Sequence, residues 1–492
     1  MKKTWTLLLI CAMLTGTLLS CAGKDTETKP ADGASVGTES AVESETETET
    51  EPVYPTYTDT FDGAECNMLY FDAVEFCGWS KIPCDINEPE LTGDALSDAV
   101  FTRNRKLEEM YQVKLTNEGY KDMSKCSLIE KQVLAGDTQY DLVFPAWNTM
   151  YSFVTSHSVT DLTGLFDFSM PWFDAKSRDA FTIGGKTYAV ISDATYMDKL
   201  LSMAILFNQQ MVTDYNLGDI YGMVLDGTWT FEEMVKMCEA VSEDVDGNGV
   251  YDRNDRFGLI NQDDGIYELY NGGGLYFCKI GDDGTPVIAD DSELAVSVLQ
   301  KILTLMNNER LFFNRGKQGL STVEICNMFA EGRGLFILRQ IQAAFELRDM
   351  ETDFGIIPVP KMYEGQADYH TSIGYTVATT QCIPAVVKNT HMSVVILDTM
   401  AAESYYSVNS VLYDTILGQK LARDEVSREN LEIIFANRFY DPGCVYNFGS
   451  IASDWMANVG KGPEQVASLL EKNQPKIEKA IEKFMTALTE EE

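Results

Sequence analysis

Histidine is scarce in this chain of 492 residues, and the catalytic motifs that depend on it are absent. The three histidines, His157, His370 and His391, lie far apart, and none has another histidine or a cysteine at metal-ligand spacing. There is no Gly-x-Ser-x-Gly elbow, no His-Glu-x-x-His pair and no kinase motif set. A glycosidase needs only two carboxylates, but nothing selects two of the 76 acidic residues. We therefore expect a protein that is not an enzyme.

Basic residues and phosphate-binding motifs are also few. The chain has 38 lysines and arginines against 76 acidic residues, a net charge of −38, which disfavours binding to a phosphate backbone. The run Gly272-Gly273-Gly274 has neither the preceding strand nor the following helix of a phosphate loop, and no dinucleotide motif occurs. We expect no nucleic-acid partner.

The eleven cysteines include no Cys-x-x-Cys pair, so zinc and thioredoxin-type sites lack support. Without Cys11 and Cys21 the number left is nine, which is odd. The sequence leaves two alternatives open, namely buried thiols or one or two disulfides.

Long apolar runs are limited to the beginning of the chain. Leu7 to Leu19 is almost wholly apolar, follows two lysines and is too short to span a bilayer, as in a secretory signal peptide over residues 1–20. The sequence Leu18-Leu19-Ser20-Cys21 is typical of a bacterial lipobox, although an ordinary signal peptide with an incidental cysteine is the alternative. We expect Cys21 to carry lipid chains that anchor the protein to the extracytoplasmic face of a cell membrane.

The residues that follow divide into a linker and a folded part. Residues 21–60 are rich in Thr, Glu and Ser and poor in apolar residues, which predicts a disordered spacer. The remaining part, about 430 residues, exceeds one ordinary core and predicts two lobes. Short apolar runs such as residues 140–144, 202–208 and 334–338 alternate with helical patterns such as residues 94–110, which predicts an α/β fold.

Three segments in succession carry a family resemblance. Phe329 to Phe336 contains a Gly-interrupted helix end and an apolar strand; Asp353 to Lys361 contains two prolines that predict an extended crossing; Tyr369 to Tyr375 is a polar loop with aromatic residues. This order resembles family one of the extracellular solute-binding proteins, which includes the maltose and oligosaccharide binders of ATP-driven importers. Gly185-Lys-Thr-Tyr-Ala-Val190 and Thr228-Trp229-Thr230 are similar to that family as well.

The resemblance implies a two-lobe, periplasmic-binding-protein-like fold of type II, with a hinge and a ligand cleft between the lobes. Lobe one is expected over 61–193 with 358–415, and lobe two over 194–357 with 416–492. It further implies a monomer that captures a carbohydrate, expected to be an oligosaccharide, and delivers it to the membrane subunits of an ABC transporter. The alternative is a surface lipoprotein without a transport role, such as an adhesin or the ligand-binding partner of a sensor.

Aromatic and polar residues in the expected cleft loops are the candidate sugar contacts. Open α/β sheets bind ligands in the loops that follow their strands, where an aromatic ring stacks on a sugar face and an amide bonds hydroxyl groups. For several of these aromatic residues, simple packing is an equal alternative. The candidates are Trp79, Trp147, Asn148, Asp193, Tyr196, Tyr270, Tyr369, Tyr375 and Trp455.

A twelve-residue acidic segment from Asp244 to Asp255 predicts a calcium loop. Oxygen-bearing side chains occupy loop positions 1, 3, 5, 9 and 12, glycine occupies position 6, and position 7 offers its backbone carbonyl. Position 12 is aspartate in place of the usual glutamate. A metal-free acidic turn is the alternative to a structural Ca²⁺ site. The expected ligands are Asp244, Asp246, Asn248, Val250, Asp252 and Asp255.

Overall fold

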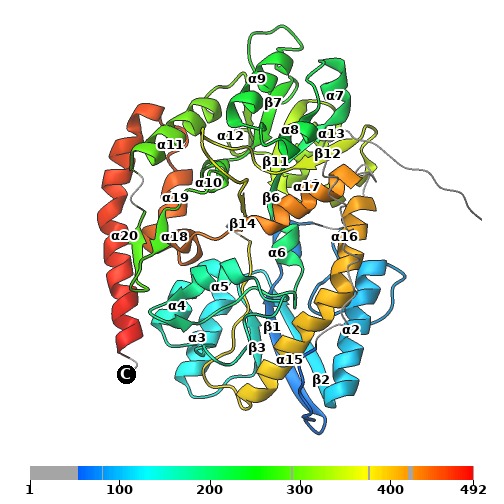
Figure 1. The fold of residues 1–492 in the computed structure, drawn as a ribbon, viewed down its shortest axis with the longest axis vertical. Coiled ribbons are helices and arrows are strands. Elements are labelled where there is room, and N and C mark those ends of the chain that lie inside the picture. Colours follow the sequence, from blue (N-terminus) through cyan, green and yellow to red (C-terminus); the bar gives the residue numbers. More distant parts are fainter. Residues whose placement is uncertain (1–53, 80, 290–291, 375–376, 419–424, 491–492) are drawn as a thin grey trace, which may run out of the picture. The chain divides into compact units, whose positions relative to one another are not determined.

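The structure is a computed structural model that describes residues 54–79, 81–289, 292–374, 377–418 and 425–490 (Figure 1). These residues belong to one unit, Pro52–Glu492. The predicted signal peptide, the lipidation residue Cys21 and most of the predicted linker lie outside the described residues. None of the described helices combines the length and the apolar character that crossing a bilayer requires.

The first lobe is built on a parallel sheet. Its strand order is β2-β1-β3, with β1 at Ala64–Phe71, β2 at Val113–Tyr120 and β3 at Leu142–Phe144. The helix α2 (Ala95–Tyr111) connects β1 to β2, as parallel strands require. Asp94 caps this helix by accepting from the backbone N–H groups of Leu96 and Ser97, which lowers the cost of starting it. Other elements of this lobe are α1 (Ala73–Cys77), α3 (Cys126–Leu134), α4 (Met150–Thr155), α5 (Ala175–Phe181), β4 (Thr182–Ile183) and β5 (Lys186–Thr187).

The second lobe contains a five-stranded sheet in the order β10-β7-β11-β6-β12. Its strands are β6 (Met203–Asn208), β7 (Phe257–Asn261), β10 (Phe312–Asn314), β11 (Gly334–Gln340) and β12 (Phe354–Ile357). β7, β10 and β11 are parallel, whereas β6 runs antiparallel to both β11 and β12. All of their residues are buried, as in a sheet covered on both faces.

Helices cover this second sheet (Figure 1). α9 packs against β7 and β11, α13 against β11 and β7, and α17 against β12. The elements around the sheet are α7 (Gln209–Asp214), α8 (Ile220–Leu225), α9 (Phe231–Val241), α10 (Gly265–Gly272), β8 (Cys278–Ile280), β9 (Pro286–Ile288), α11 (Ser292–Met306), α12 (Arg315–Gln318), α13 (Thr322–Ala330) and α14 (Ala343–Glu346).

Two crossings join the sheets. The first contains α6 (Met197–Leu200) and enters β6. The second leaves β12, which is an edge strand, at Pro358, so the prolines end the sheet where the sequence predicted an extended crossing. β13 (Thr371–Ser372) in the second crossing pairs with β14 (Arg438–Phe439). Residues 378–383 then return to the first lobe, where Cys382 pairs with Val143 of β3.

The C-terminal part of the chain is helical. α20, drawn in red in Figure 1, packs against α11 of the second lobe and α4 of the first. It therefore contacts helices of both lobes. The helices of this part are α15 (Thr390–Glu403), α16 (Asn409–Gly418), α17 (Glu425–Ala436), α18 (Pro442–Val445), α19 (Ile451–Met456) and α20 (Val466–Thr489).

All nine cysteines in the described residues are free thiols, and seven of them are buried. Of the two alternatives that the sequence left open, the structure has buried thiols. Burial raises the pKa of the Cys326 thiol to about 11, with the Arg339 guanidinium opposing the shift, so this thiol is protonated and unreactive at neutral pH.

Candidate ligand-binding site

The exit of β11 lies against the first crossing between the lobes. The backbone N–H of Ile341 donates to the carbonyl of Ser202, and that of Gln342 donates to the carbonyl of Leu200, both at 2.9 Å. Gly374 of the second crossing donates to the carbonyl of Leu201, also at 2.9 Å. The carboxyl edge of the second sheet therefore faces the hinge, which is where open α/β sheets bind ligands.

The first lobe approaches the same edge. Met197 of α6 helps to line a cavity of about 400 Å³ at the end of β1, together with Asp72, Trp79 and Asp85. Burial raises the pKa of the Cys77 thiol to about 11, while the guanidinium groups of Arg339 and Arg315 in the second lobe act to lower it. An interaction of this kind requires the end of α1 to lie close to those arginines.

An ion pair joins the two lobes close to this cavity. Lys81 Nζ lies 3.0 Å from Asp349 Oδ2 and donates to the Glu346 carbonyl at 3.4 Å. Lys81 follows Trp79 in the first lobe, and Glu346 and Asp349 follow β11 in the second. The two lobes thus contact each other beside the ends of β1 and β11.

Buried polar side chains without partners gather at the carboxyl edge of the second sheet. Arg339 is only 2% exposed and Gln342 only 1% exposed. Among the described residues, no hydrogen-bond partner exists for Arg339 Nε and Nη2, Gln342 Oε1 and Nε2, Gln340 Oε1 or Asp264 Oδ1. Buried polar groups are nearly always hydrogen-bonded. This concentration therefore points to a site for a ligand with many hydrogen-bonding groups.

Acidic groups beside these side chains have raised pKa values. Burial raises the pKa of Asp264 to about 6, and a hydrogen bond from Gln262 and the charge of Arg339 oppose the shift. Burial and the neighbouring Asp264 raise the pKa of Glu268 well above its ordinary range. Burial and the like charge of Arg339 lower the pKa of Arg315. The two carboxyl groups thus hold their protons more readily than exposed carboxyl groups do, whereas Arg315 holds its proton less readily than an exposed arginine.

The candidate residues of the first lobe lie at the ends of β1 and β3. Trp79 lines the cavity described above, and its Nε1 is buried with no partner among the described residues. Trp147 is buried in the apolar core directly after β3. Asn148 follows it, and its buried Oδ1 has no partner among the described residues. The structure therefore places polar atoms of Trp79 and Asn148 at strand ends, as the sequence predicted.

The hinge candidates have partners within the protein. Tyr196 is buried and donates its hydroxyl to the Pro83 carbonyl at 2.8 Å. Asp193 forms a buried ion pair with Lys199. Both residues stabilise the first crossing, and in this conformation their polar groups form contacts within the protein.

The remaining candidates fall into separate places. Tyr270 stacks on Phe277 with ring centroids 4.5 Å apart, and Phe277 lies 6.1 Å from Trp455, so these side chains form one aromatic cluster. Tyr369 is buried apart from them, with Lys361 Nζ 5.0 Å from its ring centroid. Tyr375 lies outside the described residues.

The polar residues of the second lobe were not predicted from the sequence. The predicted strand ended at Leu338, whereas β11 continues through Arg339 and Gln340. The signal was available, since Asp264 comes soon after the buried strand β7 and Arg339 directly after the apolar run of β11. The rule that drew attention to Trp147 would have found them had it been applied to lobe two.

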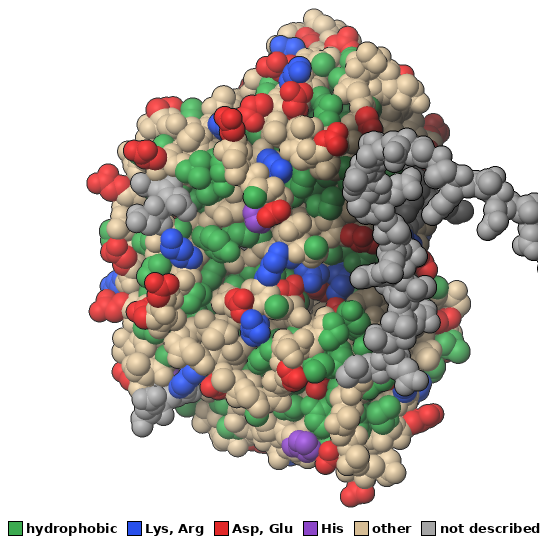
Figure 2. Space-filling model, viewed as in Figure 1, with side chains coloured by type: hydrophobic (Ala, Val, Ile, Leu, Met, Phe, Trp, Pro, Cys, Tyr) green, Lys and Arg blue, Asp and Glu red, His purple; other side chains and the backbone are tan. Residues whose placement is uncertain are grey.

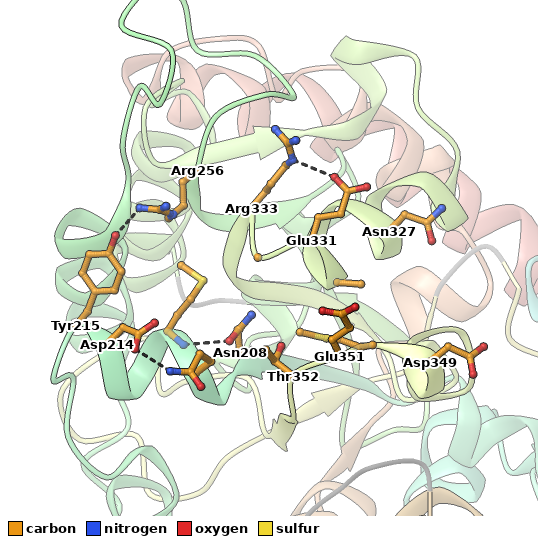
Figure 3. Close-up of a pocket in the computed structure, with 15 residues that line it drawn as sticks. Asn208, Asp214, Tyr215, Arg256, Asn327, Glu331, Arg333, Asp349, Glu351 and Thr352 are labelled. Carbon is orange, nitrogen blue, oxygen red and sulfur yellow. Dashed lines mark hydrogen bonds and ion pairs between the residues drawn. The ribbon is translucent and has the colours of Figure 1, made fainter.

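A larger hollow lies at the opposite edge of the second sheet, where β7 and β11 begin (Figure 3). Its volume is about 1090 Å³, and Asn208, Arg256 and Arg333 are among its lining residues. Its arginines are already paired, with Arg333 Nε 3.0 Å from Glu331 Oε2 and Arg256 bonded to Tyr215. This hollow is a poorer candidate for the ligand site than the carboxyl edge of the second sheet, because it lies away from the crossings and its charges are already paired.

The acidic segment from Asp244 to Asp255 forms a loop between α9 and β7. Carboxylate oxygens of Asp244, Asp246 and Asp255 lie within 4.8 Å of one another, a spacing that would allow one cation to contact all three. Asp255 is fully buried and accepts from the backbone N–H groups of Val245 at 2.9 Å and Asp252 at 2.8 Å. The donor set is all oxygen, as hard cations such as Ca²⁺ require.

The excess of acidic over basic residues is visible on the surface of the protein. In Figure 2, acidic side chains lie along the upper and left margins of the face in view, and a few basic ones gather near its middle.

The two sheets, the paired crossings and the polar carboxyl edge define the fold of the two-lobe solute-binding proteins, and the predicted fold class is confirmed. One solved structure with this fold is an ABC substrate-binding protein from Listeria monocytogenes in complex with cycloalternan, with a TM-score of 0.55 and 14% identity over 85% of this chain and 99% of that one. Another is the maltose/maltodextrin-binding domain from Bdellovibrio bacteriovorus bound to maltotriose, with a TM-score of 0.54 and 15% identity over 85% and 100%.

A third is the GacH receptor of Streptomyces glaucescens, solved unliganded and with acarbose, with a TM-score of 0.56 and 12% identity over 85% and 99% of the two chains. No protein-family model and no curated protein matches the chain.

Proposed function

We propose that this protein is an extracellular solute-binding lipoprotein that captures a carbohydrate between its lobes and delivers it to an ABC importer. The observation that carries the proposal is the set of buried, unpartnered polar side chains around Arg339 and Gln342 at the hinge. Its role is binding and release, without catalysis.

Carbohydrate is the ligand class that suits this set best. A sugar offers hydroxyl groups that donate and accept, and the site supplies donors from Arg339, acceptors from Asp264 and both from Gln342. The solved structures with this fold carry cycloalternan, maltotriose and acarbose by their descriptions. Fold alone does not determine which ligand a protein binds. The proposal of a carbohydrate therefore depends on the polar groups of the site together with these solved structures.

Capture depends on closure of the lobes. A ligand that contacts both lobes lowers the free energy of the closed state, and the importer subunits recognise that state. The monomer is sufficient for this cycle, because both walls of the cleft come from one chain.

Location follows from the beginning of the chain. Cleavage before Cys21 and lipid attachment to it would anchor the protein on the extracytoplasmic face of the membrane, and residues 22–60 would act as a spacer. A surface lipoprotein without a transport role, such as an adhesin or the ligand-binding partner of a sensor, is the second candidate, because it would need the same anchor. Importer subunits encoded beside the gene favour transport, whereas a neighbouring histidine kinase favours sensing.

A structural Ca²⁺ ion in the loop from Asp244 to Asp255 completes the proposal. Its support is the approach of the Asp244, Asp246 and Asp255 carboxylates in a loop with calcium-binding spacing. The ion would tie the end of α9 to β7, far from the proposed sugar site.

The function is tested by a thermal-shift screen of residues 22–492 against mono- and oligosaccharides. A ligand at 100 times its dissociation constant adds about 2.7 kcal/mol to the free energy of unfolding, which raises the melting temperature measurably. Gln342→Ala should abolish the shift, whereas Gln318→Ala, at an exposed position of α12, should keep it. A broad panel without any response would contradict carbohydrate binding.

A further inference from the structure

Arg339 is an unpaired cation in the interior of the protein. It is the penultimate residue of β11, opposite Ala204 of β6, and it is only 2% exposed. No carboxylate of the described residues forms an ion pair with it, although ion pairs exist for Arg333 and Arg348 nearby in the chain. A buried charge without a partner is costly, so an anion bound at this place would stabilise the protein.

The free edge of the guanidinium defines the shape of that anion. Nε and Nη2 are the two atoms without partners among the described residues. Their N–H groups point in the same direction and match two oxygens of one planar acid group. A pair of neighbouring hydroxyl groups would accept the same two hydrogen bonds but would leave the charge uncompensated.

A second positive charge beside Arg339 makes a negatively charged ligand still more favourable. Arg315 of α12 is a second cation, and it donates to neutral groups: Nε to Gln262 Oε1 at 2.6 Å and Nη1 to the Leu320 carbonyl at 2.9 Å. Burial lowers the pKa of Arg315, and repulsion from Arg339 lowers it further. An anion bound between them would relieve that repulsion.

The acidic neighbours compensate these positive charges only in part. Burial raises the pKa of Asp264 to about 6, so at pH 7 it is mostly ionised and acts on Arg339 through its charge, but no hydrogen bond or ion pair joins the two side chains. Burial and the neighbouring Asp264 raise the pKa of Glu268 well above its ordinary range, toward the neutral form. Asp263 accepts from Asn314 Nδ2 at 2.7 Å and so has its own partner. Cys77, the titratable group on the side of the first lobe, is a neutral thiol at physiological pH because burial raises its pKa to about 11.

We propose that the carbohydrate carries a carboxylate, as a hexuronic acid does, and that Arg339 binds this carboxylate through Nε and Nη2 with Arg315 as the supporting cation. The inference rests on the proposed carbohydrate function and narrows it from sugars in general to acidic sugars. Arg339 would act as the residue that determines specificity, and Gln342 and Asp264 would bind hydroxyl groups.

The test compares each acid with its methyl ester, which keeps the shape of the sugar and removes the charge. Trimers of galacturonate and mannuronate and a glucuronate-containing oligosaccharide, each with its methyl ester, and neutral maltotriose are titrated calorimetrically into residues 22–492 at pH 7. One acid should bind at least about 100-fold more tightly than its ester, because the free acid alone completes a buried charge pair.

Variants assign the preference to the guanidinium. Arg339→Gln should lose about 100-fold in affinity for the acid and only a few-fold for the ester. Arg339→Lys keeps the charge but loses the two-pronged geometry, and it should recover only part of the preference. Arg333→Gln, outside the site, should behave as the unchanged protein does, and circular dichroism checks that each variant is folded.

Each outcome decides a different claim. Tight binding of a neutral sugar, or equal binding of acid and ester, would overturn the acidic-sugar inference and leave the proposed function standing. Binding of a peptide or amino-acid carboxylate without any sugar would overturn both. Should Arg339→Gln not fold, the comparison of acid with ester in the unchanged protein and in Arg339→Lys still decides the inference.

Discussion

Arg438 of β14 binds the carboxylate of Asp174 at the start of α5, with Nη2 2.6 Å and Nε 3.0 Å from Oδ2. The same oxygen accepts from the Tyr440 hydroxyl at 2.9 Å, and the other carboxylate oxygen caps α5 through the N–H of Ser177. One buried carboxylate therefore fastens a helix of the first lobe to the C-terminal part of the chain.

Removal of the Arg438 guanidinium should destabilise the protein strongly. Arg438→Gln leaves Asp174 and Asp198 buried without their common partner, since Arg438 Nη1 also lies 2.9 Å from Asp198 Oδ2. We expect a loss of about 3–5 kcal/mol in the free energy of unfolding by urea. Arg428→Gln removes an exposed pair with Asp414 at 3.5 Å and should cost less than about 1 kcal/mol. Equal losses would contradict a structural role for the buried pair.

The same pair predicts a dependence on pH. Burial acts to raise the pKa of Asp174, but the charge of Arg438 and the hydrogen bonds from Ser177, Arg438 and Tyr440 hold it below the ordinary value of 3.8. A carboxyl group of this kind stabilises the fold above its ordinary pKa, and that contribution is lost as the pH falls through the lower folded value. The difference between the unchanged protein and Arg438→Gln should therefore shrink from pH 7 to pH 3, when measured by urea unfolding. A constant difference would show that the charge of Asp174 is irrelevant.

Substitution of Asp441 should also lower the stability of the protein strongly. Its buried carboxylate accepts from the backbone N–H groups of Phe277 at 2.6 Å, Gly443 at 2.7 Å and Cys278 at 3.2 Å. Asp441→Ala leaves these donors buried and unsatisfied, and we expect a loss of about 3 kcal/mol or more. Asp283→Ala removes a carboxylate that accepts one bond, from Thr285, in an exposed turn, and should cost less than about 1 kcal/mol. Both values come from chemical unfolding.

Calcium should stabilise the protein through the acidic loop. We expect the melting temperature to rise with Ca²⁺ and to fall again with chelator, because an ion that binds only the folded state stabilises it. Asp246→Asn should abolish the rise with little effect in chelator, because Asp246 is exposed and its contacts lie within the loop. Asp282→Asn, at another exposed acidic position, is the matched control. A calcium response that survives Asp246→Asn would place the ion elsewhere.

The sequence predicted the fold because the signals for it are local. The apolar run before Arg339 has the length and composition of a buried strand, and Pro358 ends β12 at the edge of the sheet, as proline must. Asp94 is a residue type that commonly caps helices, and its carboxylate caps α2 at the start of the predicted helical pattern. Each of these features depends on a few neighbouring residues.

The site was harder to predict because it depends on which side chains are left without partners after folding. Tyr196 was proposed as a contact for its aromatic ring, yet its hydroxyl bonds the Pro83 carbonyl across a long separation in the chain. Arg339 and Gln342 follow the apolar run from Gly334 to Leu338, which marks them as strand-end residues but does not show whether they are buried. Only the packing of β11 against the first crossing shows that both are buried.

The most direct test of the proposed function is a crystal structure of residues 22–492 with the oligosaccharide that gives the largest thermal shift. We predict electron density for the sugar between the end of β1, near Trp79, and the exit of β11, with hydrogen bonds to Arg339 and Gln342. Density for the sugar in the hollow beside Asn208 and Arg333, or contacts with one lobe only, would contradict the proposed site.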